Sequence, residues 1–464
     1  MALFASLEAC KEFIRGTLEL VPGGGLRVLE EGRLRGGVID ALVYNAVFHP
    51  RLEVQAASRW LIRAAGEALG KARASIQGLY EAMGRGEEGG FTVPAVNIRG
   101  LSYDVARALF RAARRNEVGA LVCEIARSEM AYTQQRPAEY AAVVTAAAIK
   151  ENFPGPLFLQ GDHFQLDAKR LKADPEKEVA GLTRLIGEAL EAGFYNIDVD
   201  TSTLVDLGRP SLAEQQRENF ERAAELTAFI RSREPEGVTV SVGGEIGEVG
   251  GKNSTVEEFR AFIEGYREAL GRRADGAKGI SKISIQTGTS HGGVVLPDGS
   301  VARVKVDFEA LRTISEVARR EYGLSGTVQH GASTLPEEVF DKFPEVGASE
   351  IHLATAFQTL LYEHLPREVV EEIHGYLRVA CAGERKEGET DEQFFYKTRK
   401  RGLGPFKRRL WDLPAQVREG VGRVLEERFD LLMRKLKVAG TCEAVARRVR
   451  AVPAREAPPE GLAA

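Results

Sequence analysis

Between residue 91 and about residue 375, short runs rich in β-branched residues alternate with longer segments of helical period. The runs are FTVPAVNI, ALVCEIA, PLFLQGDH, NIDVD, TVSVGGEIG, KISIQTG, GTVQHG and EIHLATA. Strands that alternate with helices predict parallel crossover units. Eight units over about 285 residues suit a closed (β/α)8 TIM barrel, whose usual length is about 250 residues. We expect this α/β barrel rather than a doubly wound open sheet, because no early glycine-rich dinucleotide turn appears.

The segments on either side of these runs predict helices. Residues 1–88 carry patterns such as SRWLIRAAGEALGKARASIQGLYEAM, which indicate a helical N-terminal extension before a barrel at residues 89–380. Residues 381–464 include EGVGRVLEERFDLLMRKLKV, the pattern of an amphipathic helix, and a Pro-, Ala- and Glu-rich ending that predicts disorder. The chain is therefore expected to be a barrel with helical segments at both ends.

A basic segment, KTRKRGLGPFKRRLWDLP, precedes this last helix. Runs of charge are usually solvated faces, and that is the first interpretation. Contact with a phosphate or with another subunit is the alternative, with Arg408 and Arg409 as candidates for a distal phosphate.

Composition restricts the class of partner. A formal net charge of -4 gives no reason to expect nucleic acid or an anionic membrane as a partner. No run approaches the roughly 20 apolar residues of a membrane span, and no leader is evident at the N-terminus. The four cysteines are far apart and form no CxxC pair, which favours a reducing, cytoplasmic location.

Three of the seven histidines fall at equivalent places, beyond the carboxyl ends of predicted strands. His163 ends the third run, His291 follows the sixth, and His330 ends the seventh. A lone histidine is more often structural than a ligand, but working residues of such barrels gather at this rim. Three imidazoles with an open fourth position are typical of catalytic zinc, and Co²⁺ also suits nitrogen donors. The placement therefore predicts a divalent metal site.

Acidic residues share the expected rim. Asp162 precedes His163, and we expect it to take part in chemistry and to point away from that histidine if the strand continues. Asp200 ends the fourth predicted strand and Glu245 ends the fifth. These two could hold the metal, orient a histidine, or merely cap the next helix.

Small residues follow two of these histidines: Gly292 and Gly293 after His291, and Gly331, Ala332 and Ser333 after His330. Such turns let backbone amides approach a phosphate closely, although glycine after a strand is mostly just a turn. Beside presumed metal ligands, they indicate a metal and a phosphate within one small molecule's length. A phosphorylated ketose or triose fits that description.

These motifs resemble the class II, metal-dependent fructose-bisphosphate and tagatose-bisphosphate aldolases. The resemblance runs from about residue 91 to residue 360, through VNIRG, GDH, GFYNIDVDTST, GGEIGEVGG, GTSHGG, QHGASTLPEE and GASEIHLATAFQ. It implies reversible cleavage of a ketose bisphosphate, with fructose 1,6-bisphosphate first among substrates, into dihydroxyacetone phosphate and an aldehyde. A zinc-stabilised enediolate would be the intermediate, and carbohydrate metabolism such as glycolysis the setting.

The same resemblance implies roles for individual residues. His163, His291 and His330 would hold Zn²⁺ or another divalent ion such as Co²⁺, and Asp162 would be the acid/base. Asn97, Gly292, Gly331, Ser333 and Thr355 would bind substrate, the last four around a phosphate and beside a monovalent cation. Self-association into dimers or larger assemblies is also implied.

The chain departs from the family in two motifs, and its long N-terminal extension is also unusual for the family. The loop after the fifth strand usually carries glutamates, one of which moves a proton on the triose carbon, whereas this chain has Lys252 and Asn253. Glu248 or Glu245 could replace it, or the loop could have been rebuilt. Where the family's last strand reads NxDTD, this chain has His352, Ala354, Thr355 and Ala356. Three alternatives therefore stand beside the first hypothesis: an aldolase for another phosphorylated ketose, a non-catalytic aldolase-like subunit, and another metal-dependent barrel enzyme such as a hydrolase.

Overall fold

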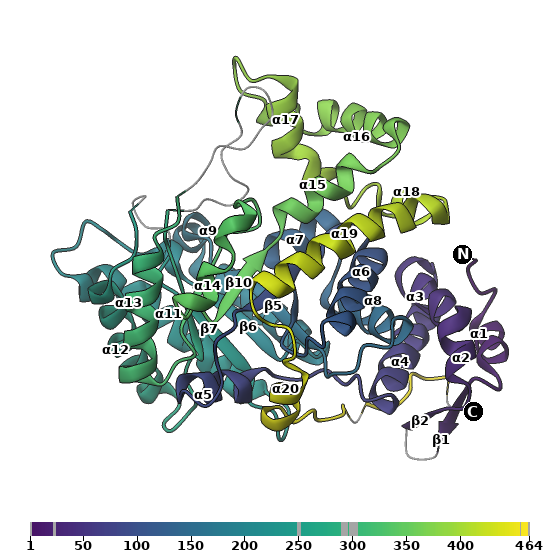
Figure 1. Cartoon of the computed structure of the whole chain (residues 1–464), viewed down its shortest axis with the longest axis horizontal. Helices are drawn as coiled ribbons and strands as arrows, with labels where there is room; N and C mark the ends of the chain where they lie inside the picture. The colour runs from purple at the N-terminus through teal and green to yellow at the C-terminus, as the bar shows by residue number, and fades with distance from the viewer. Residues whose placement is uncertain are drawn as a thin grey trace.

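A closed barrel of eight parallel strands forms the centre of the computed structural model, which describes residues 2–21, 25–247, 252–288, 296, 305–454 and 456–462 (Figure 1). Each strand pairs with its neighbours in sequence, and the last closes onto the first. The strands are β3 (Val93–Asn97), β4 (Val122–Ala126), β5 (Phe158–Gln165), β6 (Asn196–Asp200), β7 (Ser241–Glu245), β8 (Lys282–Ile285), β9 (Thr327–Gln329) and β10 (Glu350–Leu353). The predicted (β/α)8 barrel and all eight predicted strands are thus confirmed.

Helices with apolar faces cover the outside of the barrel. In α10, for example, Leu182, Leu185, Ile186, Ala189 and Leu190 recur at helical spacing and are all buried. The covering helices are α6 (Ser102–Arg115), α7 (Arg127–Thr133), α8 (Pro137–Lys150), α9 (Ala168–Ala173), α10 (Pro175–Glu191), α11 (Leu212–Arg233), α12 (Val256–Arg273), α13 (Phe308–Tyr322), α14 (Lys342–Glu345) and α15 (Thr355–Glu363).

The N-terminal segment is helical as predicted, but it also contains a short antiparallel hairpin that the helical patterns did not indicate. Its last helix lies at the amino end of the barrel, where Tyr80 reaches Glu350 at the start of β10. The elements are α1 (Leu7–Ile14), β1 (Leu18–Val21), β2 (Gly25–Val28), α2 (Glu31–Arg33), a π-helical turn (Leu34–Val38), α3 (Ile39–Phe48), α4 (Leu52–Ala68) and α5 (Gln77–Gly84).

The C-terminal segment returns along the barrel after α16 and α17 project beyond its carboxyl end, at the top of Figure 1. The described residues of the ending, for which composition predicts disorder, lie along α4: Trp60 Nε1 donates to the carbonyl of Glu456 and Arg63 to that of Ala454. Leu462 is buried in the same hydrophobic core. The elements are α16 (Arg367–Ala380), a turn of 3-10 helix (Ala382–Glu384), α17 (Asp391–Thr398), a second such turn (Arg399–Gly402), α18 (Lys407–Trp411), α19 (Ala415–Lys435) and α20 (Cys442–Arg448).

No helix in the described part of the chain is both long and apolar enough to span a membrane.

Candidate active site

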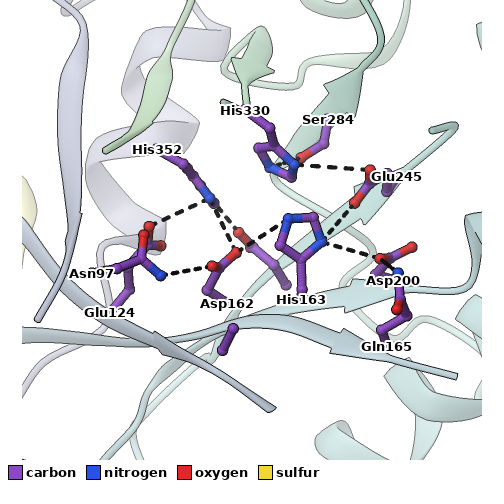
Figure 2. Close-up of polar contacts among 12 residues, drawn as sticks. Asn97, Glu124, Asp162, His163, Gln165, Asp200, Glu245, Ser284, His330 and His352 are labelled. Carbon is purple, nitrogen blue, oxygen red and sulfur yellow. Dashed lines mark hydrogen bonds and ion pairs between the residues drawn. The ribbon is translucent and has the colours of Figure 1, made fainter. Parts of the chain in front are cut away.

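Polar side chains from several strands meet at the carboxyl end of the barrel (Figure 2). The rings of His163 and His330 lie 4.3 Å apart between centroids, and the ring of His352 stacks on His330 at 4.4 Å. Asp162 reaches the same place, with its Oδ1 3.1 Å from His352 Nδ1. The structure thus gathers most of the predicted rim residues, and adds one histidine that the sequence did not assign to the site.

The end of β5 departs from regular strand geometry, and this decides where Asp162 and His163 point. The pairing of β5 with β6 shifts register between Gly161 and Phe164, and His163 has a left-handed backbone with φ of 40°. A Cβ on Gly161 would lie 2.5 Å from the ring of Phe164, so the irregular strand end requires glycine there. The two side chains would point apart only in a strand that continued regularly. Because regular alternation ends at this bulge, His163 Nε2 instead lies 3.7 Å from Asp162 Oδ1.

Asp162 is held from two sides. Asn97 Nδ2 donates to its Oδ2 at 2.8 Å, and His352 contacts its Oδ1. Burial alone would raise the pKa of Asp162, but the imidazoles of His163, His352 and His330 outweigh burial and hold this pKa well below its usual range. The predicted acid/base is thus fixed in position and stabilised as a carboxylate.

His163 and His330 share one carboxylate, that of Glu245. His163 Nδ1 lies 3.4 Å from Glu245 Oε2, and His330 Nδ1 lies 3.8 Å from Oε1. Burial, and next the charge of Asp200, raise the pKa of Glu245 to about 7. Glu245 therefore bridges the two histidines at the centre of the rim.

Asp200 lies beside His163 but is occupied by other partners. Its Oδ2 accepts from Gln165 Nε2 at 2.5 Å and lies 3.1 Å from His163 Nδ1, while its Oδ1 accepts from the Ser202 hydroxyl at 2.7 Å. Of the three roles open to Asp200, orienting the His163 ring agrees best with these contacts.

The donor set at the rim fits a divalent ion of the zinc type. One group of possible ligands is Asp162, His163 and His330, and another is His163, Asp200 and Glu245; within each group the donor atoms lie within 4.8 Å of one another. Zinc bonds of about 2.0 Å in a tetrahedron place donors about 3.3 Å apart. His330 Nδ1 lies 3.8 Å from Glu245 Oε1, and His163 Nε2 lies 3.7 Å from Asp162 Oδ1, so both separations are near that value. These pairs leave His163 Nδ1 to its contact with Asp200.

His352 occupies the position between the rim and the barrel interior. Its Nε2 lies 2.6 Å from Glu350 Oε1, and its Nδ1 faces Asp162. Burial would lower the pKa of His352, but the carboxylates around it, first Glu124 and then Asp162 and Glu350, raise it well above its usual value. The alternation of β10, which points residues 350 and 352 the same way, was the signal that could have placed this ring inside the barrel.

The remaining predicted residues divide into three groups. Asn97, Gly331, Ser333 and Thr355 line one cavity of about 580 Å³ together with Asp162 and His163. Lys252 and Asn253 contact the starts of neighbouring helices instead, through Glu258 and Asp307. His291, Gly292 and Glu248 lie outside the described residues.

Among the solved structures that are similar to this chain, one with a TM-score above 0.5 supports the barrel fold. A probable tagatose 6 phosphate kinase from Sinorhizobium meliloti 1021 superposes with a TM-score of 0.52 at 18% identity, covering 77% of this chain and 93% of its own. Fructose-bisphosphate aldolase from Campylobacter jejuni gives 0.48 at 18% identity, covering 80% and 98%. The YdjI aldolase from Escherichia coli K12 gives 0.48 at 12%, covering 80% and 99%. The family model described as fructose-bisphosphate aldolase class-II matches residues 78–433, so the chain belongs to the class II fructose-bisphosphate aldolase family.

Proposed function

We propose that this class II aldolase cleaves the bond between C3 and C4 of a phosphorylated ketose, releasing dihydroxyacetone phosphate and an aldehyde. The observation that supports the proposal best is the position of Asp162. Its carboxylate is fixed by Asn97 and His352, lines the cavity, and lies beside His163 and His330. A base held in place at the mouth of a metal-binding barrel is what this reaction requires.

His163, His330 and Glu245, with His291, which follows β8 in the sequence, are the residues that would hold the metal on which this family depends. When bound, a divalent ion such as Zn²⁺ supplies a Lewis acid toward the carbonyl and neighbouring hydroxyl oxygens of a ketose. Asp200 and Ser284 then act on the ligands: Asp200 orients His163, and the Ser284 hydroxyl lies 3.1 Å from His330 Nε2.

Asp162 takes the proton from the hydroxyl of the carbon that becomes the aldehyde, as the carbon–carbon bond breaks. In the reverse direction it returns that proton. Asn97 and His352 keep the carboxylate in one orientation, which preserves the short approach that proton transfer needs.

The phosphate of the dihydroxyacetone phosphate half belongs beside Gly331, Ser333 and Thr355. Gly331 has φ of 65°, which opens the turn after β9, and Ser333 Oγ accepts from the amide of Ala356 at 3.2 Å. Thr355 begins α15, whose first amides have no partners within the helix. The two segments face one cavity, and together they offer backbone donors of the kind that bind phosphate.

Release of triose phosphate from fructose 1,6-bisphosphate is the direct test. The purified protein should lose activity on chelation and recover it with Zn²⁺, while His330→Ala should bind less zinc and release no product. His364→Ala is the matched control, because His364 is exposed and contacts its own helix at Leu360. A protein that binds zinc at the rim but cleaves neither this sugar nor related ketose phosphates would overturn the proposal.

A further inference from the structure

A line of hydrogen bonds connects the active-site carboxylate to the opposite end of the barrel. Asp162 Oδ1 lies 3.1 Å from His352 Nδ1, and His352 Nε2 lies 2.6 Å from Glu350 Oε1. The other oxygen of this glutamate, Oε2, accepts from the hydroxyl of Tyr80. All four residues are at most 5% exposed. They therefore form one buried network inside the barrel, which we call the interior network.

Tyr80 enters this network from outside the barrel. It belongs to α5, the last helix of the N-terminal segment, which lies at the end of the barrel opposite α16 and α17 (Figure 1). Just before this helix, the amide of Ile76 donates to Asn196 Oδ1, at the start of β6, at 2.9 Å. A Cβ on Gly78 would collide with the carbonyl oxygen of Arg448, so glycine permits the close approach of α5 and α20. The helix is thus fixed on both sides, and Tyr80 with it.

The two oxygens of Glu350 are held by different partners. Oε1 accepts from Gln160 Nε2 at 3.0 Å and from Lys282 Nζ, in addition to its contact with His352. Within the described chain, Tyr80 is the hydrogen-bond partner of Oε2. Burial, and next the charge of Glu350, raise the pKa of Tyr80 well above its usual value, so the phenol keeps its proton and donates. Tyr80 therefore sets how the carboxylate is rotated about its terminal bond.

His352 passes this orientation on to Asp162. Its imidazole is a rigid ring with one nitrogen toward Glu350 and the other toward Asp162, so it cannot turn without losing one of the two contacts. Asn97 Nδ2 holds the second oxygen of Asp162 at 2.8 Å, which leaves Oδ1 to the ring. A rotated Glu350 carboxylate would shift the ring, and the shifted ring would turn the carboxylate of Asp162.

We propose that Tyr80 is a positioning residue of the reaction, which keeps the Asp162 carboxylate aligned through Glu350 and His352. The inference rests on the proposed function, in which Asp162 takes a proton from the substrate. It gives the N-terminal segment a part in catalysis, from the end of the barrel that faces away from the substrate. Alignment matters because a misplacement of about 1 Å at a reaction site can lower the rate roughly a hundredfold.

Tyr80→Phe removes one hydroxyl and keeps the buried ring. We expect kcat to fall about 5- to 20-fold with KM nearly unchanged, because the base is misaligned while the groups that bind substrate are untouched. Release of triose phosphate from fructose 1,6-bisphosphate gives both constants, and zinc content checks the metal site. A kcat within about twofold of the wild-type value would overturn the inference.

Tyr266→Phe is the matched control. Tyr266 is as deeply buried as Tyr80 and lines the same cavity of about 290 Å³ at the amino end of the barrel. Its hydroxyl, however, donates to Thr227 Oγ1 on α11 at 3.0 Å, outside the interior network. This variant loses the same chemical group and should keep the wild-type kcat. Equal falls of kcat in the two variants would mean that the network is not involved.

A second background separates positioning from a general loss of packing. In His352→Asn the shorter side chain interrupts the network, so adding Tyr80→Phe should lower kcat by less than about twofold more. Urea unfolding checks that every variant is folded under the assay conditions. If Tyr80→Phe lowered kcat by the same factor in both backgrounds, its effect would not pass through His352 and the inference would fail.

A spectroscopic measurement keeps this inference separate from the proposed reaction. In protein labelled with ¹⁵N at histidine, the ring N–H signals of His352 are those that His352→Asn lacks. They should move in Tyr80→Phe and keep their positions in Tyr266→Phe. If they do so in a protein that cleaves no ketose phosphate, the interior network stands and the proposed reaction fails. Coincident signals in Tyr80→Phe and the wild type would reject the network, whatever the activity.

Discussion

Two cations are buried in different surroundings. Lys282 lies inside the barrel below the rim, with Asp198 and Glu350, in a region we call the barrel floor. Arg399 lies in the outer wall of the cavity, in the turn after α17. On the floor, Lys282 is 1% exposed and contacts Asp198 at 2.9 Å, Gln160 at 2.8 Å and Glu350. On the outer wall, Arg399 has no such acid within the described chain. A buried charge with its counterions in the same chain is explained by the fold itself, whereas one without them suggests that something else supplies the opposite charge.

Substitutions at the rim, which lies between these two regions, should have the largest effect on activity. Asp162→Asn removes the base but keeps the shape, so kcat should fall about 10²- to 10⁴-fold. Triose phosphate release measures this, and zinc content checks that the metal site survives. Asp206→Asn is the control, because Asp206 is exposed and contacts Arg209. If Asp162→Asn kept a tenth or more of wild-type kcat, Asp162 would not be the acid/base.

A substitution in the barrel floor should lower the free energy of unfolding. Lys282→Met leaves Asp198 and Glu350 buried without their cation, which should lower the free energy of unfolding by about 3–5 kcal/mol. Urea denaturation monitored by circular dichroism gives the value. Lys278→Met is the matched control, because Lys278 pairs with Glu81 at the exposed surface. A loss below about 1 kcal/mol would show that the floor does not depend on this ion pair.

His352 contacts Asp162 at the rim and Glu350 at the floor, so its substitution should affect both activity and stability. In His352→Asn, which restores the residue of the family motif, a shorter side chain replaces the ring that contacts Asp162 and Glu350 at once. We expect the free energy of unfolding to fall by about 1.5–3 kcal/mol, the usual effect of a hydrogen bond to a charged group. A smaller fall in kcat than in Asp162→Asn should accompany it, with KM nearly unchanged. An unchanged unfolding curve would show that the contacts of His352 with Asp162 and Glu350 do not stabilise the fold.

The smallest effect is expected at the surface of the C-terminal segment. Arg401 pairs with Glu384 at 2.7 Å, and both side chains are at least 40% exposed. Arg401→Gln should change the free energy of unfolding by about 0–1 kcal/mol, because water and salt weaken such a pair. Thermal unfolding at low and at high salt measures it. A larger loss would mean that this segment depends on the pair to remain folded against the barrel.

The sequence pattern was sufficient to predict the barrel, because the hydrophobic periods of strands and helices depend only on residues close together in the chain. Each run had its own β-branched residues and each intervening segment its apolar stripe, as α10 illustrates. The same locality placed Asp162, His163 and His330 at strand ends, where parallel strands bring them together. The hairpin β1–β2 was missed because the helical patterns around it were dominant and its two strands are short.

Other features depended on contacts between distant residues. The contacts of the C-terminal ending with α4, nearly 400 positions away in sequence, could not be read from its own composition. His352 appeared as a departure from a motif, and only the barrel showed that it lies between Asp162 and Glu350. In the sequence Arg399 is one of several basic residues. Only the packing shows that it is buried, whereas Lys400 and Arg401 are exposed.

The sequence by itself determined the barrel, the rim and the chemical types of its donors, because these follow from local periods and from strand ends. Only the tertiary structure decided which way each donor points and which charges lack partners. The bulge at Gly161 and Phe164 turned Asp162 and His163 toward one site, and the return of the C-terminal segment placed Arg399 at the same cavity. Both depend on side chains far apart in sequence, whose packing no local pattern records.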